Sequence, residues 1–505
     1  MTTRILVTRP PGAASKLVGT DLEVVLPAGC VKRKLLGGSV VAELTELQLS
    51  ATARAHPYLA FEADQDLVPL APMPGLGVRV GPDRAEQLSF DLACDETGEP
   101  IDGAIVFAQQ LGLTSQGSGL KGRATVSTFE PVVHVVVSPA CNYWSKVLPA
   151  QPASSTTKVR LKRLVPRGSA AWERELVGVG ADNSARGEGV KVGVVDSGIA
   201  EHQDLQVQGG WCALDERAEA FLEDESGHGT HCAGIIAGKG LEGGVAGIAP
   251  HAELYSLRVH PGGKLSDLLA ALQWAINNQL DVLNLSLGIA QPSLALSWKV
   301  QEAAAAGITL VAAAATDAEQ VSSPAGLDGV IGVSAIGQLR ELPEDTAHVL
   351  RVSELCNRET GLFVPNFAAQ GGGLNLVAPG VAVISSVPGG YAAWDGTSAA
   401  CAFVAGLVCV ALSAYPELRT KDALQPARVR ELLESSALDL TLPAELQGTG
   451  LAHAGALLAE AEHRRATAQV TERSDADRAQ RLTELVNRLG AQRGSIRELL
   501  DSLSP

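Results

Sequence analysis

The chain has 505 residues, a formal net charge of −16 and 46% hydrophobic residues. A chain of this length is expected to form two to four domains, and its apolar content is sufficient for large buried cores. The acidic balance argues against nucleic-acid binding, which needs a concentrated positive field. Aromatic residues make up only 4% of the chain while glycine occurs 53 times, which favours tightly packed α/β architecture over an aromatic-rich binding surface.

The N-terminal sequence, MTTRILVTRPPGAASKLVG, lacks the apolar core and the small-residue cleavage site of a secretory signal. The most apolar stretch, Ala399–Leu412, is shorter than the ~20 residues that a bilayer-spanning helix needs, so it predicts a buried helix. The eight cysteines show neither CxxC nor metal-ligand spacing, and we expect reduced, mostly buried thiols. We therefore expect a cytoplasmic protein without membrane contact, with unconventional export as the alternative.

Residues 1–72 predict a small α+β domain. The expected elements are strands, a helix and a final apolar run, at Arg4–Thr8, Leu22–Val25 and Ser39–Leu44, then Thr45–Ala55, then Tyr58–Leu70.

Residues 75–147 alternate polar and apolar positions between turn signals such as Asp95–Gly98 and Gly117–Gly119, which predicts antiparallel β-structure. The runs ETGEPIDGAIVFAQQ and VVHVVVSP resemble prealbumin-like or carboxypeptidase-regulatory β-sandwiches. We therefore expect a β-sandwich-like domain, with an unrelated β-domain as the alternative.

Residues 148–175 are rich in Pro, Ser and Thr and then basic, which predicts an exposed, cleavable linker. The segment contains the hexapeptide LVPRGS at Leu164–Ser169. Because this hexapeptide is identical to a thrombin site used in expression vectors, it is either engineered or a chance match in a basic linker.

Residues 176–463 alternate apolar strands with helical segments, which predicts a mainly parallel sheet covered by helices on both faces. The expected strands are Val190–Asp196, Glu253–Val259, Val282–Leu287, Ile308–Ala313 and Val330–Ala335. Residues 464–505 are charged, with leucines at helical spacing. They predict a helical extension that packs against the body or, alternatively, binds a partner protein.

Three motifs in this region carry candidate chemistry. Asp196 ends the apolar strand KVGVVD, and ligand chemistry in open α/β sheets gathers outside such strand ends. His228 lies between two glycines in GHGTH, where small neighbours permit close approach to the imidazole. Ser398 in GTSAA stands where a helix begins, beside backbone N–H groups and the positive end of the dipole. The plainer alternatives are a turn aspartate, a zinc-binding pair with His231 and an N-cap serine.

Taken together, in the order Asp, His, Ser, these motifs resemble the subtilase family of subtilisin-like serine proteases. The resemblance covers residues 176–463 and includes GIAPHAELYSLRV, DVLNLSLG and LVAPGVAVISS. It implies a three-layer α/β fold and a serine endopeptidase acting on polypeptides without a cofactor or metal. Ser398 would form the acyl-enzyme, His228 would transfer the proton and Asp196 would orient His228.

The resemblance also implies a substrate-binding strand and an inhibitor. Ser286, Leu287 and Gly288 match the strand that pairs with an extended substrate. Residues 44–70, LTELQLSATARAHPYLAFEADQDLVPL, resemble the end of the subtilisin propeptide family. The chain is therefore expected to be an autoinhibited zymogen whose N-terminal segment, 1–72, is its own intramolecular inhibitor. Processing is expected at Leu70–Met73 or at Arg160–Arg167, and an unrelated small domain is the alternative.

The chain departs from the family where an Asn amide normally donates to the oxyanion. The strand reads LVAAAATDAEQ, which places Thr316 or, with one extra residue, Asp317 at that position. Threonine donates one hydroxyl hydrogen bond and ionised aspartate donates none. This departure motivates a second hypothesis, a weak or inert subtilase scaffold that acts as a binding or regulatory protein. A third is acyl transfer to an amine. The loop GKGLEGGVAG also lacks the family's calcium-binding Asn, so we expect no calcium there.

Overall fold

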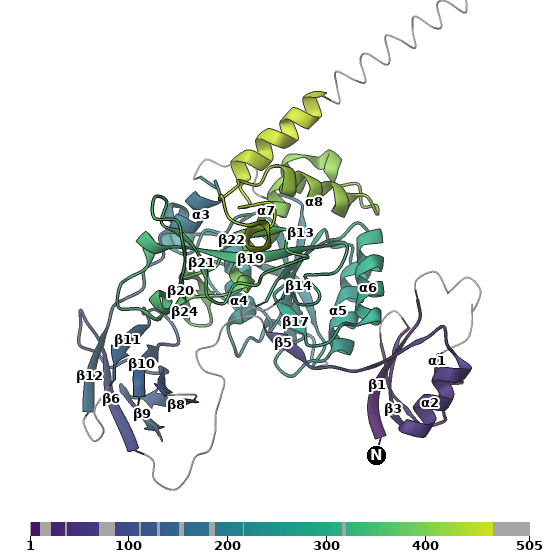
Figure 1. Cartoon of the computed structure of the whole chain (residues 1–505), viewed down its shortest axis with the longest axis horizontal. Helices are drawn as coiled ribbons and strands as arrows, with labels where there is room; N and C mark the ends of the chain where they lie inside the picture. Colours follow the sequence, from purple (N-terminus) through teal and green to yellow (C-terminus); the bar gives the residue numbers. More distant parts are fainter. Residues whose placement is uncertain are drawn as a thin grey trace, which may run out of the picture.

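The computed structural model describes residues 2–10, 22–35, 38–69, 86–110, 113–128, 132–150, 156–180, 187–215, 217–315 and 320–467. Three sheet-based bodies follow one another along the chain (Figure 1). We call them the N-terminal domain (described residues 2–69), the β-domain (86–161) and the main domain (187–467).

The N-terminal domain is a four-stranded antiparallel sheet in the order β2-β3-β1-β4 with helices on one side. Its elements are β1 (Thr2–Thr8), α1 (Leu22–Val25), β2 (Val31–Lys34), β3 (Val40–Thr45), α2 (Glu46–Ala55) and β4 (Ala60–Ala63). Helix α2 begins with a capping box between Thr45 and Gln48. The predicted strand at Leu22–Val25 is wrong: Leu22 and Leu26 enter one core at helical spacing.

The β-domain is a seven-stranded sheet in the order β11-β10-β7-β8-β9-β6-β12. Its strands are β6 (Glu86–Cys94), β7 (Ile105–Gln110), β8 (Leu113–Leu120), β9 (Arg123–Thr128), β10 (Val132–Ser138), β11 (Lys146–Pro149) and β12 (Thr156–Leu161). Strand β12 falls within the predicted linker 148–175, but it pairs in parallel with β6, and Val159 and Leu161 join the core of this domain. The sheet therefore extends beyond residue 147.

The main domain contains a nine-stranded sheet. Its parallel part has the order β14-β15-β13-β16-β18-β19-β22, with β21 and β20 added antiparallel. The bounds are β13 (Lys191–Asp196), β14 (Val207–Cys212), β15 (Glu253–Arg258), β16 (Val282–Leu285), β18 (Thr309–Ala313), β19 (Val330–Gln338), β20 (Val352–Cys356), β21 (Leu362–Pro365) and β22 (Leu376–Pro379). Four of the five expected strands are present with small shifts at their ends, whereas the expected strand Val282–Leu287 is divided: β16 ends at Leu285, and Leu287 begins a strand of another sheet.

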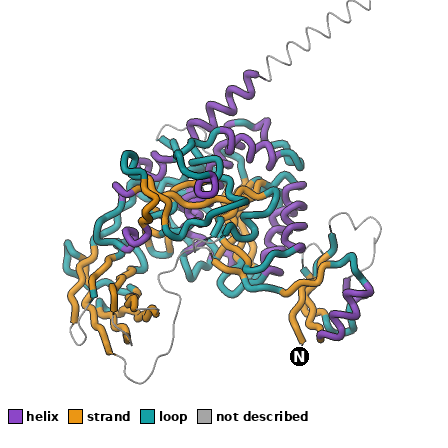
Figure 2. The backbone as a smooth tube through the Cα atoms, viewed as in Figure 1, coloured by secondary structure: helices purple, strands orange, loops and turns teal. Residues whose placement is uncertain are grey.

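Helices cover both faces of this sheet and make three layers (Figures 1 and 2). Helices α4 (His228–Ala237) and α7 (Thr397–Ala414) share one core with α8 (Gln425–Ser435), and α5 (Leu265–Asn277) and α6 (Leu294–Ala305) share the other. The α/β fold expected from the sequence is thereby confirmed. Smaller elements are β5 (Leu67–Pro69), α3 (Trp172–Leu176), β17 (Leu287–Ile289), β23 (Val383–Val387), β24 (Gly390–Trp394) and α9 (Ala444–Gln447).

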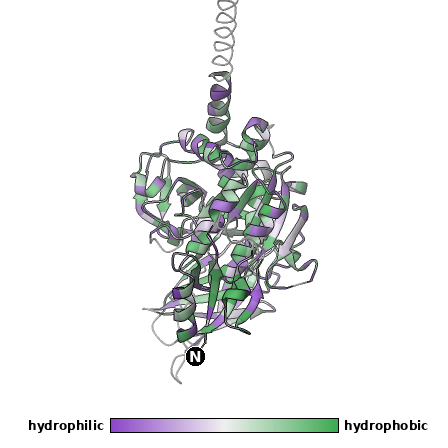
Figure 3. Cartoon of the chain, turned by 90° about the vertical axis from the view of Figure 1, so that its right-hand side faces the viewer, coloured by the Kyte–Doolittle hydropathy of each residue, from purple (hydrophilic) through white to green (hydrophobic). Residues whose placement is uncertain are grey.

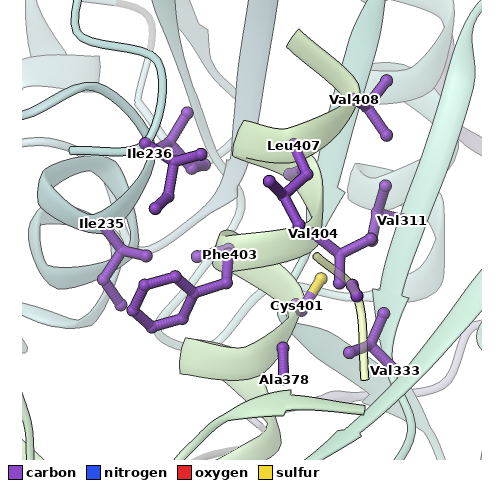
Figure 4. Packing of buried hydrophobic residues seen from close by; sticks show 14 of the residues in the cluster. Ile235, Ile236, Val311, Val333, Ala378, Cys401, Phe403, Val404, Leu407 and Val408 are labelled. Atoms are coloured by element: carbon purple, nitrogen blue, oxygen red, sulfur yellow. The ribbon is translucent and has the colours of Figure 1, made fainter. Parts of the chain in front are cut away.

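Helix α7 runs through the centre of the main domain. Its side chains Phe403, Val404 and Val408 pack between Ile235 of α4 and Val311 of the sheet (Figure 4). Among the described residues, α7 is the one helix long and apolar enough to cross a membrane, but it is almost wholly buried. It is a core helix, in agreement with the sequence. In Figure 3 apolar colouring marks strands and helices of the main domain and also strands of the N-terminal domain.

The described part of the chain ends in a helix. Residues 454–467 are helical, and the predicted extension at 464–505 lies outside the described residues from 468 onward. All eight cysteines are free, as expected.

Candidate active site

Asp196 and His228 form a buried pair at the carboxyl edge of the sheet. Asp196 ends β13, whose neighbours β15 and β16 lie on opposite sides, so it stands at the point where the strand order reverses. His228 opens α4, and its Nδ1 lies 2.8 Å from Oδ1 and 2.9 Å from Oδ2 of Asp196. This contact leaves Nε2 as the ring nitrogen for proton exchange.

The residues around the pair fix its geometry. The backbone N–H of Ser197 donates to Oδ1 of Asp196 at 2.7 Å, and the Ser197 hydroxyl accepts from the N–H of Gly229 at 2.9 Å. A Cβ on Gly229 would lie 2.1 Å from the carbonyl oxygen of Gly198. The glycine after His228 therefore allows α4 to begin directly against the end of β13.

A second carboxylate, Asp224, holds the start of α4 and is absent from the sequence-based site. It accepts hydrogen bonds from the N–H of Gly227 at 2.8 Å, and from the N–H and hydroxyl of Thr230 at 2.9 and 2.6 Å. The available signal was an acidic residue just upstream of a helix start, a position favoured by the helix dipole.

The electrostatics of the two histidines differ. Burial alone would lower the pKa of His228, but the carboxylates of Asp196 and Asp224 raise it above its ordinary value. Burial and the neighbouring His228 lower the pKa of His231 to about 3. His231 is also stacked on Trp394, with ring centroids 4.8 Å apart, and its Nε2 contacts the carbonyl oxygen of Val383. His231 is thus a neutral core residue, and the zinc alternative loses its second histidine.

Ser398 lies in the first turn of α7, next to residues from α4 and from the end of β16. Its carbonyl oxygen accepts from the Ser286 hydroxyl at 3.3 Å and lies 4.0 Å from the sulfur of Cys232, one turn after His228. Asn284 donates to the Ser286 hydroxyl at 2.9 Å. The three predicted motifs therefore converge on one region, and the side chain of Ser286 supports the start of α7.

Comparison with known proteins decides the family. The model of the subtilase family matches residues 187–455. The chain belongs to the subtilase family. Subtilisin DY from Bacillus licheniformis is 37% identical over 265 residues, covering 50% of this chain and 86% of that protein. A thermostable alkaline protease from Halalkalibacterium halodurans is 35% identical over 274 residues, covering 53% and 67%. Subtilisin E from Bacillus subtilis is 37% identical over 256 residues, covering 50% and 61%.

This subtilase is therefore a serine endopeptidase of the hydrolase class, as its motifs predicted. The expected oxyanion residues, Thr316 and Asp317, lie outside the described residues. The last described residue before them, Ala315, accepts a hydrogen bond from the Thr397 hydroxyl at 2.8 Å. The end of the LVAAAA strand is thus tied to the residue that precedes Ser398.

The predicted substrate strand of this subtilase is occupied by its own N-terminal segment. Strand β5 pairs antiparallel with β17, with Pro69 opposite Leu287, Val68 opposite Gly288 and Leu67 opposite Ile289. Leu287 and Gly288 therefore pair with an extended chain, while Ser286 contributes its side chain to the interior. The sequence prediction grouped these residues, and the structure separates their roles.

Two further features concern metals. Potential ligand atoms of Asp196, His228 and Cys232 lie within 4.8 Å of one another. An ion there would have to break the Asp196–His228 contact, and burial raises the pKa of the Cys232 thiol well above its usual value, which disfavours a metal-binding thiolate. This geometry fits a packing role for Cys232 better than a metal centre.

The loop after α4, where the family's calcium-binding Asn is missing, is closed by Asp204. Its carboxylate accepts from the N–H groups of Leu241 and Val245, each at 2.8 Å, and from the Tyr391 hydroxyl at 2.8 Å. A carboxylate surrounded by donors thus closes this loop through direct hydrogen bonds.

Proposed function

We propose that this subtilase cleaves polypeptides through an acyl-enzyme, with Ser398 as nucleophile, His228 as general base and acid, and Asp196 as the group that orients the imidazole. The Ser398 hydroxyl attacks the scissile carbonyl while His228 accepts its proton and then returns it to the leaving amine. Water, activated by His228, releases the acyl group. The buried 2.8 Å contact between His228 Nδ1 and Asp196 carries this proposal, because it selects the tautomer with Nε2 open to Ser398.

The oxyanion is proposed to be stabilised by the Ser398 N–H together with a group at position 316 or 317. Support comes from the Thr397–Ala315 hydrogen bond, which links the chain before position 316 to the nucleophile helix. The hydroxyl of Thr316 can donate, whereas Asp317 can donate only when it is protonated.

We further propose that the enzyme is made as an autoinhibited zymogen, with residues 1–72 as the pro-segment. Support comes from β5, which occupies β17 in the extended, antiparallel manner that a substrate would use. Because β17 can pair with one extended chain at a time, the pro-segment and a polypeptide substrate compete for it.

Acidic residues of the pro-segment support the same proposal by capping two helices of the main domain. Asp64 accepts from the N–H and hydroxyl of Ser266 in the first turn of α5, at 2.9 and 3.0 Å. Glu62 accepts from the N–H of Leu294 and the hydroxyl of Ser293 at the start of α6, both at 2.6 Å. A carboxylate at a helix N-terminus contributes about 0.3–2 kcal/mol, so these contacts hold the segment in register.

Of the two processing regions predicted, we favour Leu70–Met73, although these residues themselves lie outside the described part. They directly follow β5, which ends at Pro69, paired with Leu287 of β17. The alternative region, Arg160–Arg167, begins inside β12 and includes Leu164, which is only 5% exposed. Cleavage at Leu70–Met73 leaves the β-domain on the mature enzyme.

N-terminal sequencing of protein retained through its C-terminus tests the proposal, with Ser398→Ala as the matched control. The expected result is a new N-terminus between residues 70 and 74 in the parent chain and an intact chain in Ser398→Ala. Identical cleavage in both would exclude self-processing. A fluorophosphonate should label the processed enzyme at Ser398. Absence of label after processing would favour the inert binding scaffold.

A further inference from the structure

A second aspartate–histidine pair joins the turn that leads into the nucleophile helix to the short helical segment Ala347–Arg351. His348 Nδ1 is 2.6 Å from Oδ1 of Asp395, and the two side chains are 4% and 6% exposed. We call residues 395–398 the nucleophile turn, because they connect Asp395 directly to Ser398. Asp395 and His348 have no part in the proton transfers proposed above.

Asp395 ties the nucleophile turn to the neighbouring chain. Its Oδ1 accepts from the N–H of Ala382 at 2.9 Å, and its Oδ2 accepts from Nε of Arg351 at 3.1 Å. Ala382 has a left-handed backbone, φ 56°, which a non-glycine residue keeps only where its surroundings hold it. The next residue, Gly396, donates its N–H to the carbonyl of Gly380 at 2.8 Å. The turn is therefore anchored by both its side chain and its backbone.

The charge on Asp395 is maintained by these contacts. Burial alone would raise the pKa of Asp395, but His348, Arg351 and the Ala382 N–H lower it to about 2. A buried carboxylate with three partners fixes the turn more strongly than a neutral hydrogen bond does.

The β-domain reaches this pair through Trp144. The indole packs edge-on against the His348 imidazole, with ring centroids 5.8 Å apart and planes at 82°. Nε2 of His348 is buried and has no hydrogen-bond partner among the described residues. The ring orientation of His348 therefore depends on Asp395 and on its packing with Trp144.

Two further sets of contacts hold the β-domain on either side of the nucleophile turn. On one side Ser145 accepts from the N–H of Ala347 at 3.1 Å, and Lys146 forms a 3.0 Å ion pair with Asp345. On the other side Asn142 exchanges two backbone-directed hydrogen bonds with Tyr391 of β24, at 2.6 and 3.0 Å. Strand β24 ends at Trp394, the residue before Asp395, so both chain segments around the turn are in contact with the β-domain.

We propose that the β-domain is a positioning element of the mature enzyme. Trp144 orients the imidazole of His348, His348 holds Asp395, and Asp395 sets the position of Ser398. The inference rests on the proposed function, because it assumes that Ser398 is the nucleophile. Asp395 and His348 are positioning residues. Loss of Trp144 should lower the rate of attack by Ser398 and leave substrate pairing with β17 unchanged.

The test uses the full chain after self-processing, with kcat and KM for a peptide substrate and the rate of fluorophosphonate labelling. The variants are Trp144→Ala, Trp144→Phe, Asp395→Asn and the double variant Trp144→Ala with Asp395→Asn. An edge-on aromatic contact of this kind corresponds to a change of about two- to tenfold in rate. We expect Trp144→Ala to lower kcat and labelling by that factor at constant KM, and Trp144→Phe to restore both.

Non-additivity is the decisive readout. If Trp144 acts through Asp395, Trp144→Ala should have little further effect in the Asp395→Asn background. Lys162→Ala is the matched control, because the Lys162 ammonium lies 3.7 Å from Asp345 on the same face without contacting His348. An unchanged kcat in Trp144→Ala, or additive effects in the double variant, would overturn the inference while the proposed function stands. Absence of fluorophosphonate labelling in the parent chain would contradict both the proposed function and this inference.

Discussion

Val68 of the pro-segment lies opposite Gly288 in an antiparallel pair, so the strand expected to receive substrate already carries a chain of its own. The register is regular on both sides of this pair, because Leu67 lies opposite Ile289 and Pro69 lies opposite Leu287. Under the proposed zymogen mechanism, peptidase activity requires that β5 leave β17, because both β5 and a substrate would pair with this strand.

Weakening the two helix-capping carboxylates should release the pro-segment sooner. Glu62→Gln and Asp64→Asn each replace a charged acceptor by a neutral one, and a hydrogen bond to a charged group is about 1–1.5 kcal/mol stronger than a neutral one. We expect each variant to speed the appearance of peptidase activity by about tenfold. The time course of activation measures this, with Glu46→Gln, an exposed change in α2, as the control. Equal lag times in all variants would contradict it.

The pH profile should report the raised pKa of His228. The imidazole must be neutral to accept the Ser398 proton, so kcat/KM should rise with pH through a midpoint above the ordinary His value of about 6.5. Asp224→Asn removes one of the two charges that raise this pKa, so its midpoint should lie lower. Glu225→Gln alters an exposed neighbour, 78% exposed at the side chain, and should leave the profile unchanged. If only Glu225→Gln lowered the midpoint, the raised pKa of His228 would come from exposed charges and not from Asp224.

Restoring an amide donor should strengthen the oxyanion site. Removing the single Asn oxyanion donor from subtilisin lowers kcat by about 10²–10³, so a weaker donor in this chain leaves room for improvement. We expect either Thr316→Asn or Asp317→Asn, but not both, to raise kcat by about tenfold or more at nearly constant KM. Steady-state kinetics of the two variants identify the position. No gain in either would indicate that another group serves the oxyanion.

The Asp204–Tyr391 bond predicts how stability changes in alkali. Burial and the Asp204 carboxylate raise the pKa of Tyr391 to about 12, against a usual value of 10.0. A raised pKa means that this stabilisation is complete below pH 10 and is lost as the pH rises through 12. At neutral pH the free energy of unfolding of Tyr391→Phe should therefore be about 1 kcal/mol lower than that of the parent, and this difference should disappear above pH 12. Thermal melts at several pH values test this, and a constant difference would contradict it.

Much of the main domain could be read from the sequence, because buried parallel strands are continuous apolar runs. Val192, Val194 and Val195 before Asp196 are one example, and the strand boundaries shift by only a few residues. The same apolar signal failed at Leu22–Val25, where one buried leucine per turn serves a short helix as well as a strand.

The contacts between domains could not be read in this way. The sequence of strand β12 resembles a basic linker, because only Val159 and Leu161 are apolar residues that face the core. No local sequence pattern predicts its pairing with β6, which is distant in the chain. His348 and Asp395, which lie 47 residues apart in the chain, likewise acquire their roles from distant partners. Local periodicity carries no information on such pairings.

The pro-segment and the β-domain attach to opposite flanks of the main domain (Figure 1). A single cleavage after β5 can therefore release the pro-segment and leave the β-domain attached to the main domain. The processed particle would be larger than a bare subtilisin-like domain and would keep the β-domain packed beside the nucleophile turn.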